Sequence, residues 1–232
     1  MLQLPKVIGH RGAMAYAPEN TLASFREAKR RGATWVEIDV KLTADHVPIL
    51  MHDVSLKRTT GIDRLVAETK RAELPAVVPT FEQAIACFGE LGLGCNVEIK
   101  PCKGREVETG RATVEALRRH WPRSLPAPLL SSFKDESLEA AKKAAPEYAR
   151  ALLLGELGEG WQARAEAVGA AGLNVGSKKL NAAGAVAIKR AGFVLAVWTV
   201  NDPDEAMALI GMGADCIITD KPDVILAALG QP

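Results

Sequence analysis

The sequence has no excess of charge of either sign and no long apolar run. Its 29 Lys and Arg residues are balanced by 28 Asp and Glu residues, which leaves a formal net charge of +1. Proteins that bind nucleic acid neutralise many phosphates with basic side chains, so we predict no polynucleotide partner. The longest apolar runs, such as Ala151–Leu154, are far shorter than the roughly 20 residues that cross a bilayer. We therefore predict no membrane span.

The chain also lacks paired cysteines and a recognisable leader. Its cysteines have no two-residue spacing and no nearby histidine, which argues against a zinc site or a redox dithiol, and they stand at Cys87, Cys95, Cys102 and Cys216. The first residues, Met1–Lys6, do not form the basic and apolar segments of a signal peptide. We expect a cytoplasmic protein with buried or incidental thiols.

Short apolar runs alternate with amphipathic stretches along the whole chain, which is the pattern of repeated β-α units. Eight such units can be counted, and 232 residues divided by eight is 29, close to the roughly 30 residues of one unit. We predict one α/β domain over residues 1–232, a (β/α)8 TIM barrel. The expected strands are Val7–Gly9, Trp35–Lys41 with an extension at Ile49–His52, Gly94–Ile99, Leu129–Ser131, Arg150–Leu154, Leu173–Val175, Leu195–Trp198 and Cys216–Ile218.

The segment between His52 and Thr80 is too long for an ordinary strand-to-helix loop. A helix with the period of a buried face begins only after Thr80. We predict a small insertion over about residues 53–79, after the second strand, at the mouth of the barrel.

The unusual polar residues fall at the expected strand ends. In a barrel the working groups lie at the carboxyl ends of the strands and in the loops that follow. The groups found there are His10-Arg11-Gly12, Glu37, Asp39, His52-Asp53, Glu98, Lys100, Trp198 and Asn201.

Glu37 and Asp39 are two residues apart on a strand, so both side chains point to the same face. Inside a barrel, two unpaired carboxylates need a cation or must bind protons. Glu98 could add a third carboxylate from the neighbouring strand. Hard oxygen ligands without a thiolate favour Mg²⁺ or Ca²⁺ over zinc.

Arg11 and Lys100 would add fixed positive charge, which suits an anionic substrate whose oxygens gain charge in the transition state. Simple pairing with the carboxylates is the alternative role. A purely structural network of Glu37 and Asp39 with Arg11, Lys41 or Lys100 is likewise an alternative to a metal site.

His10 and His52 are two of only four histidines, and each follows an expected strand. Either one alone would be an ordinary loop histidine. Opposite an acidic cluster, the pair suits general acid–base catalysis, because an imidazole can accept one proton and return another near neutral pH. Metal ligation is the weaker alternative.

These motifs together identify a resemblance that covers nearly the whole chain. They are His10-Arg11-Gly12, Pro18-Glu19-Asn20-Thr21, Glu37-Ile38-Asp39-Val40, His52-Asp53, Glu98-Ile99-Lys100, Ser132-Phe133, Trp198-Thr199-Val200-Asn201 and Thr219-Asp220-Lys221-Pro222. In order and spacing they resemble the glycerophosphodiester phosphodiesterase family, of the compact bacterial type.

The resemblance implies a metal-dependent barrel hydrolase. Its expected substrates are glycerophosphodiesters such as glycerophosphocholine and glycerophosphoethanolamine, and its products sn-glycerol 3-phosphate and an alcohol. Carried over by motif, the implied metal ligands are Glu37, Asp39 and Glu98, and His10 and His52 form the acid–base pair. Arg11 and Lys100 resemble phosphate contacts, Trp198 resembles the aromatic residue beside the glycerol, and Glu19 and Asn20 resemble residues that set the loop.

Other readings remain open at this point. A related barrel phosphodiesterase could act on lysophospholipid or sphingolipid head groups, as the sphingomyelinase D toxins do, although those are secreted and disulfide-bonded. A non-catalytic module could hold a phosphoester in the same site. A metal-dependent aldolase or isomerase is a third class, since fold does not dictate reaction. The sequence leaves the preferred alcohol, Mg²⁺ against Ca²⁺, the order of the histidines and the oligomeric state open.

Overall fold

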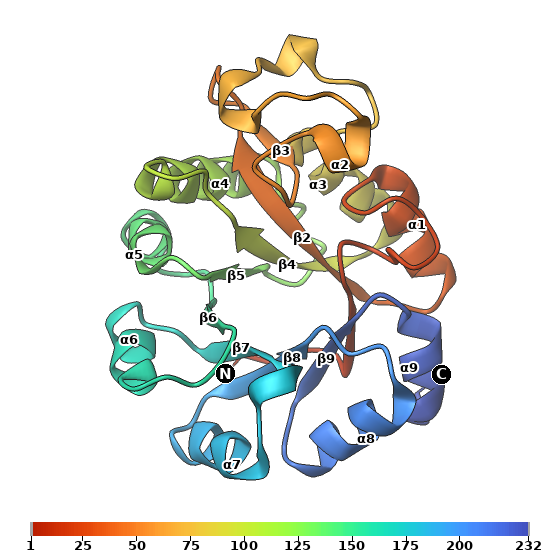
Figure 1. The fold of residues 1–232 in the computed structure, drawn as a ribbon, viewed down its shortest axis with the longest axis vertical. Coiled ribbons are helices and arrows are strands. Elements are labelled where there is room, and N and C mark those ends of the chain that lie inside the picture. Colours follow the sequence, from red (N-terminus) through yellow and green to blue (C-terminus); the bar gives the residue numbers. More distant parts are fainter. Residues whose placement is uncertain (1, 232) are drawn as a thin grey trace.

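A closed barrel of parallel strands forms the centre of the molecule (Figure 1). The computed structural model describes residues 2–231. Within that range β1 pairs with both β9 and β2, which closes the sheet. This confirms the (β/α)8 barrel. Its strands are β1 (Val7–Gly9), β2 (Trp35–Leu42), β4 (Gly94–Ile99), β5 (Leu129–Ser132), β6 (Arg150–Leu154), β7 (Gly172–Gly176), β8 (Val194–Trp198) and β9 (Cys216–Thr219).

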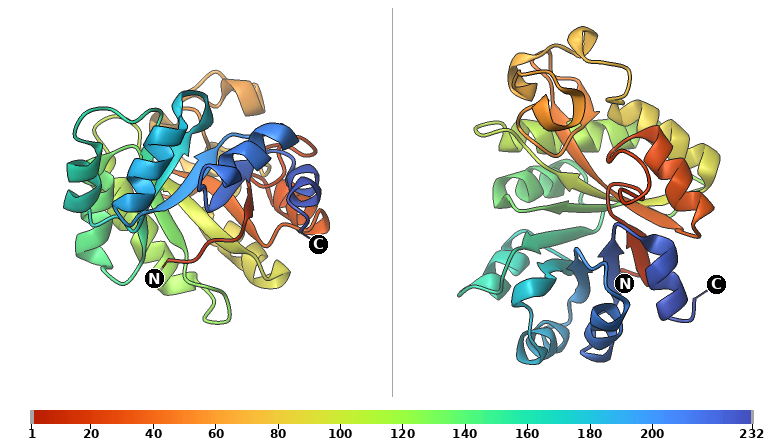
Figure 2. Two further views of the ribbon diagram at one scale, coloured as in Figure 1. Left: turned by 90° about the horizontal axis from the view of Figure 1, so that it is seen from below. Right: turned by 45° about the vertical axis from the view of Figure 1, so that its right-hand side comes forward.

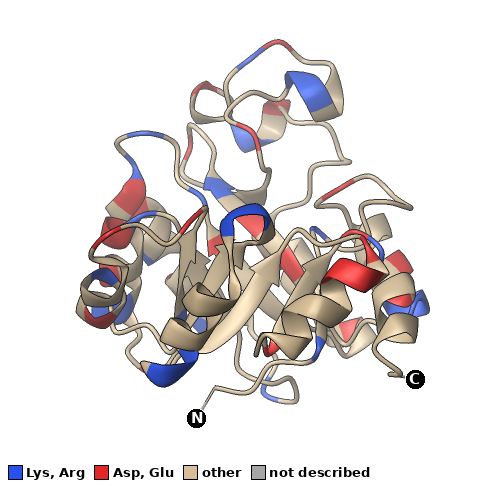
Figure 3. Ribbon diagram, turned by 60° about the horizontal axis from the view of Figure 1, so that its bottom comes forward, with Lys and Arg blue, Asp and Glu red and all other residues tan. Residues whose placement is uncertain are grey.

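The helices surround the strands and begin at recognisable caps. The Thr21 hydroxyl accepts the Ser24 N–H at the start of α1, and Thr80 caps α3 in the same way. Basic and acidic residues are interspersed over the outer helices (Figure 3). These helices are α1 (Leu22–Arg30), α3 (Phe81–Leu91), α4 (Glu106–His120), α5 (Asp135–Ala144), α6 (Trp161–Ala167), α7 (Ala182–Arg190), α8 (Pro203–Gly211) and α9 (Pro222–Ala228).

The interior of the barrel changes from apolar to polar along β2. Trp35, near its start, packs with Ile8, Leu129 and other buried side chains that fill one end of the barrel. Side chains two apart share a face, so Glu37 and Asp39 stand above Trp35 on the inner side. The apolar layer therefore closes one end, and the polar groups gather at the carboxyl ends of the strands.

The segment after β2 departs from the barrel pattern. The expected extension at residues 49–52 is instead a separate strand, β3 (Pro48–Leu50), which runs antiparallel to the end of β2, so His52 lies in the loop beyond it. Residues 53–79 then form α2 (Lys57–Thr60) and two short 3₁₀ turns, Val66–Glu68 and Arg71–Glu73. A small apolar cluster that includes Leu56 and Val66 packs these turns against Ile49 of β3 and against Cys102.

This insertion, drawn in orange to gold, stands out from the rim of the barrel in Figures 1 and 2. It follows the second barrel strand, as the sequence predicts. No helix within residues 2–231 has both the length and the apolar character to cross a membrane. Over the same range, the four cysteines are buried and free, as expected.

Candidate active site

A tight turn after β1 presents His10 and Arg11 at the mouth of the barrel. A Cβ on Gly9 would lie 2.2 Å from the Gly12 carbonyl oxygen. A Cβ on Gly12, whose φ is +91°, would lie 2.3 Å from the Ser24 hydroxyl. Only glycine fits at these two positions. The Ser24 hydroxyl also donates to the Arg11 carbonyl oxygen at 2.8 Å, which ties the turn to α1.

Three carboxylates meet inside this mouth. Oxygens of Glu37, Asp39 and Glu98 all lie within 4.8 Å of one another, and the three side chains are buried. Asp39 and Glu98 are direct neighbours across β2 and β4. The parallel pairing of these strands therefore brings Glu98 beside Glu37 and Asp39, from which it is about 60 residues distant in sequence.

Burial and mutual repulsion act on these carboxylates differently. Burial, reinforced by the charge of Asp39, raises the pKa of Glu98 to about 7 and raises the pKa of Glu37 well above its usual value. Burial opposes ionisation of Asp39 too, but Lys100 and Arg11 outweigh it and lower the pKa of Asp39. One carboxylate stays ionised, while two bind protons readily unless more positive charge is present.

Lys100 and Arg11 are the basic side chains that contact the carboxylate cluster. Lys100 Nζ lies 3.1 Å from Asp39 Oδ1 and 2.9 Å from Glu98 Oε1, and Arg11 Nε lies 3.2 Å from Asp39 Oδ2. Lys41 instead donates to the Lys100 carbonyl oxygen at 2.9 Å. The expected ion-pair network thus exists, but two cations face three carboxylates. A set of buried hard oxygens with surplus negative charge can hold a divalent cation.

His10 is oriented from the opposite end of the chain. Its Nδ1 lies 2.7 Å from Asp220 Oδ1, and Asn201 Nδ2 donates to the other oxygen of Asp220 at 2.6 Å. A carboxylate only accepts, so Nδ1 carries the proton and Nε2 is left for chemistry. That Nε2 lies 3.9 Å from Glu37 Oε2, so it faces the acidic cluster.

His52 is oriented by its own neighbour. Its Nδ1 lies 2.7 Å from Asp53 Oδ1, and Arg58 Nε of the insertion donates to Asp53 Oδ2 at 2.6 Å. Burial lowers the pKa of His52, although the nearby carboxylates oppose this effect. Because the Asp53 carboxylate can only accept a hydrogen bond, Nδ1 of His52 carries a proton and donates it to Asp53.

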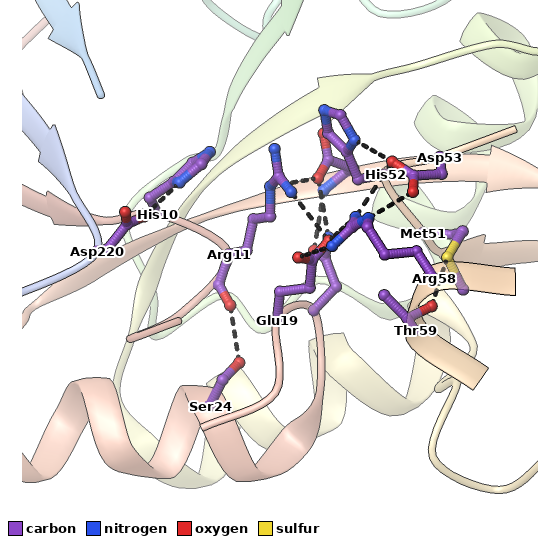
Figure 4. Close-up of polar contacts among 12 residues, drawn as sticks. His10, Arg11, Glu19, Ser24, Met51, His52, Asp53, Arg58, Thr59 and Asp220 are labelled. Atoms are coloured by element: carbon purple, nitrogen blue, oxygen red, sulfur yellow. Dashed lines mark hydrogen bonds and ion pairs between the residues drawn. The ribbon is translucent and has the colours of Figure 1, made fainter. Parts of the chain in front are cut away.

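Arg58 connects the insertion to the loop before α1. Its two terminal nitrogens donate to Glu19 at 2.7 and 2.8 Å, and Glu19 also accepts from Arg11 at 2.9 Å (Figure 4). Asn20 hydrogen-bonds Asp39 through both its amide nitrogen, at 2.8 Å, and its carbonyl oxygen, at 3.2 Å. Glu19 and Asn20 therefore lie where the expected loop-setting residues should.

A cavity of about 150 Å³ lies between these groups. Its aromatic side is formed by Trp198 and Phe133, whose rings meet edge to face at 5.6 Å. Trp198 Nε1 donates to the Asn174 carbonyl oxygen, which fixes the indole. The structure brings the predicted site residues together. Asp39 does not line the cavity but forms ion pairs with two residues that do, Arg11 and Lys100. The predicted residues that line it are His10, Arg11, Glu37, His52, Glu98, Lys100 and Trp198.

Several residues of this site had no predicted role. Asp220 belongs to the Thr219–Pro222 motif and Arg58 to the predicted insertion, but nothing in either segment indicated that it would contact a histidine or the partner of one. The one local signal for such a contact was Asp53, which follows His52 directly in the sequence. Buried Asn96 Oδ1 and Ser131 Oγ have no protein partner among residues 2–231 and lie at the cavity, so they can bond water or a ligand.

The fold and site together define an α/β-barrel enzyme with carboxylates, cations and two imidazoles at the carboxyl-terminal mouth. A model of the glycerophosphoryl diester phosphodiesterase family matches residues 10–224. The chain belongs to this family. It is a glycerophosphodiester phosphodiesterase.

Individual relatives span nearly the whole chain. YhdW of Bacillus subtilis is 31% identical over 95% of this chain and 96% of its own length. The glycerophosphodiester phosphodiesterase of Caldanaerobacter subterraneus subsp. tengcongensis is 29% identical, with 95% and 96% covered. A phosphodiesterase of Oleispira antarctica, solved in complex with the product sn-glycerol-3-phosphate, is 39% identical, with 98% of each chain covered and a TM-score of 0.95.

Proposed function

We propose that this enzyme hydrolyses glycerophosphodiesters such as glycerophosphocholine and glycerophosphoethanolamine by general acid–base catalysis from His10 and His52. The observation that carries the proposal is the pair of imidazoles at one cavity, each with its Nδ1 held by a carboxylate. The Oleispira antarctica relative with bound sn-glycerol-3-phosphate supports that product.

Glu37, Asp39 and Glu98 would hold a divalent cation, Mg²⁺ or Ca²⁺, which when bound neutralises phosphate charge and orients the diester. The donor set fits, since three buried carboxylates exceed the two neighbouring cations. Arg11 and Lys100 contact the phosphate oxygens and compensate the charge that grows there. Trp198 lies beside the glycerol, where its fixed ring limits the orientation of that moiety.

The two histidines divide the proton transfers. The Nε2 of one neutral histidine accepts the proton of the attacking hydroxyl while the hydroxyl oxygen bonds to phosphorus. The other histidine acts as an imidazolium with a proton on both ring nitrogens, and it gives its Nε2 proton to the alcohol oxygen as the P–O bond breaks. The glycerol's own hydroxyl is the first nucleophile in this scheme, and it forms a cyclic phosphate. Water then opens the ring with the two roles exchanged, so the proton balance of the enzyme is restored.

An assay of glycerophosphocholine hydrolysis tests substrate and cofactor together. The enzyme is stripped with chelator and then given Mg²⁺ or Ca²⁺. We expect loss of choline release after chelation and recovery with one of the metals. Full activity in excess chelator would exclude metal dependence, and absence of product under every condition would exclude this substrate. Release of choline from lysophosphatidylcholine but not from glycerophosphocholine would favour the phospholipid head-group reading.

A further inference from the structure

A second cavity lies directly beyond His52. It has a volume of about 330 Å³ and runs between the loop before α1 and the insertion. His52 lines both this cavity and the catalytic one. The imidazole that the proposed reaction uses therefore borders both spaces.

The catalytic cavity is small for a site that binds a whole diester. Small-molecule sites commonly measure about 300–1,000 Å³, whereas this cavity holds about 150 Å³. Trp198 and Phe133 close its aromatic side. With the phosphate at Arg11 and Lys100, one of the two ester groups has room to extend past His52, which also lines the second cavity.

We propose that the second cavity is the binding site for the alcohol moiety of the diester, and that the insertion thereby selects the substrate. The inference rests on the proposed function. With glycerol beside Trp198 and phosphate at the carboxylate cluster, the alcohol passes His52 and lies against the insertion.

The walls indicate the kind of alcohol. Apolar side chains come from both sides, including Met14 of the loop and Val77 of the insertion. The two charged residues, Glu19 and Arg58, bind each other through two hydrogen bonds, and Arg58 is also bonded to Asp53 (Figure 4). Among the described residues of this wall, Arg58 is the only Lys or Arg, and its guanidinium is already bonded to two carboxylates. The site fits a compact alcohol that carries no negative charge and has an apolar surface, such as a quaternary ammonium alcohol.

Val77 offers a direct test, because it lines the cavity and its side chain is 50% exposed, so a larger residue can be accommodated without unfolding the core. Leu65 is a matched control in the same insertion, 44% exposed and away from the cavity wall. Val77→Trp and Leu65→Trp are compared on two substrates, glycerophosphocholine and the methyl ester of glycerol 3-phosphate, whose alcohol is too short to reach the insertion.

We expect Val77→Trp to lower kcat/KM for the choline ester by at least about tenfold while that for the methyl ester stays unchanged, a size typical of steric discrimination in a pocket. Leu65→Trp should alter neither substrate. In the wild-type enzyme the uncharged 3,3-dimethylbutyl ester should be used, and a glycolate ester, with its carboxylate, should be poorer than the methyl ester. Thermal unfolding of each variant verifies folding, and Val77→Phe replaces Val77→Trp if the latter does not fold.

Equal kcat/KM for the choline ester in Val77→Trp and wild type, or an equal loss on both substrates, would overturn the alcohol site while leaving the hydrolase intact. Preference for the glycolate ester would overturn the assigned class of alcohol. Failure of the wild-type enzyme to hydrolyse any of these esters would instead remove the proposed function, and the alcohol site with it.

Discussion

The two histidines of the site are held by different regions of the molecule. His10 stands on the seam of the barrel, where Asp220 and Asn201 follow β9 and β8 and lock its ring. His52 stands beyond β3, and its partner Asp53 is bonded by Arg58 of the insertion. Both imidazoles line one cavity, and each has its Nδ1 bonded to a carboxylate.

The difference lies in what supports each ring. The Asp220 carboxylate accepts from a neutral amide within the barrel frame, whereas the Asp53 carboxylate accepts from a guanidinium of the insertion. The geometry of His10 therefore depends on closure of the barrel. The geometry of His52 depends on the insertion, which packs through a small apolar cluster against β3 and the loop after β4.

Removal of either imidazole should have the largest effect. His10→Ala and His52→Ala should each lower kcat by about 100-fold or more, the usual contribution of a general acid or base. His46→Ala is the control, because His46 is exposed and pairs with Glu108 away from the cavity. Steady-state hydrolysis of glycerophosphocholine measures all three. Near wild-type kcat in both site variants would reject the acid–base pair.

Loss of the carboxylates that orient the histidines should have a smaller effect on activity. It should also distinguish the barrel frame from the insertion by its effect on stability. Asp220→Ala and Asp53→Ala should each lower activity about 10- to 100-fold, as is typical when a group that orients a catalytic residue is lost. Asp220→Ala should also lower the melting temperature, since it leaves the amide of Asn201 without its partner in the barrel frame. Asp53→Ala should not. The same melting temperature for both would contradict the distinction between frame and insertion.

Arg58 tests the insertion alone. Arg58→Gln should lower kcat/KM about fivefold, or ~1 kcal/mol, because Asp53 and Glu19 lose a partly exposed charged donor. Arg64→Gln is matched to it, since Arg64 lies in the same insertion, pairs with Glu73 and is similarly exposed. Arg58→Lys should recover little, because an ammonium cannot bridge two carboxylates as the planar guanidinium does. An equal loss in Arg64→Gln would mean that the insertion acts only through its stability.

The carboxylate cluster, which both histidines share, should respond to pH. The pKa of Glu98 is about 7, raised first by burial and then by Asp39, so this group is protonated below that pH and a metal must displace the proton. Metal affinity should fall by at least about tenfold for each pH unit below 7, and binding should release at least one proton, because the pKa of Glu37 is raised as well. Calorimetry in buffers of different ionisation enthalpy measures both. Affinity that is independent of pH from 5 to 8 would contradict the assignment of Glu98 as a ligand.

Local signals in the sequence were sufficient for much of the architecture. The spacing of apolar runs located all eight barrel strands, and Thr80 marked the start of α3 correctly. The extension after β2 was wrong because a short apolar run predicts a strand without its direction or its partner. The strand β2 is eight residues long but pairs with β4 only from Trp35 to Val40, so its last residues are available to pair with β3.

The sequence by itself determined the barrel, the carboxylate pair on one strand and the candidate histidines, because periodicity and residue chemistry act over a few neighbouring positions. Only the tertiary structure decided which groups orient those histidines. Asp220 meets His10 across 210 residues through closure of β1 on β9, and Arg58 meets Glu19 across 39 residues through the fold of the insertion. Contacts of this kind depend on the direction and pairing of whole elements, and no local pattern encodes them.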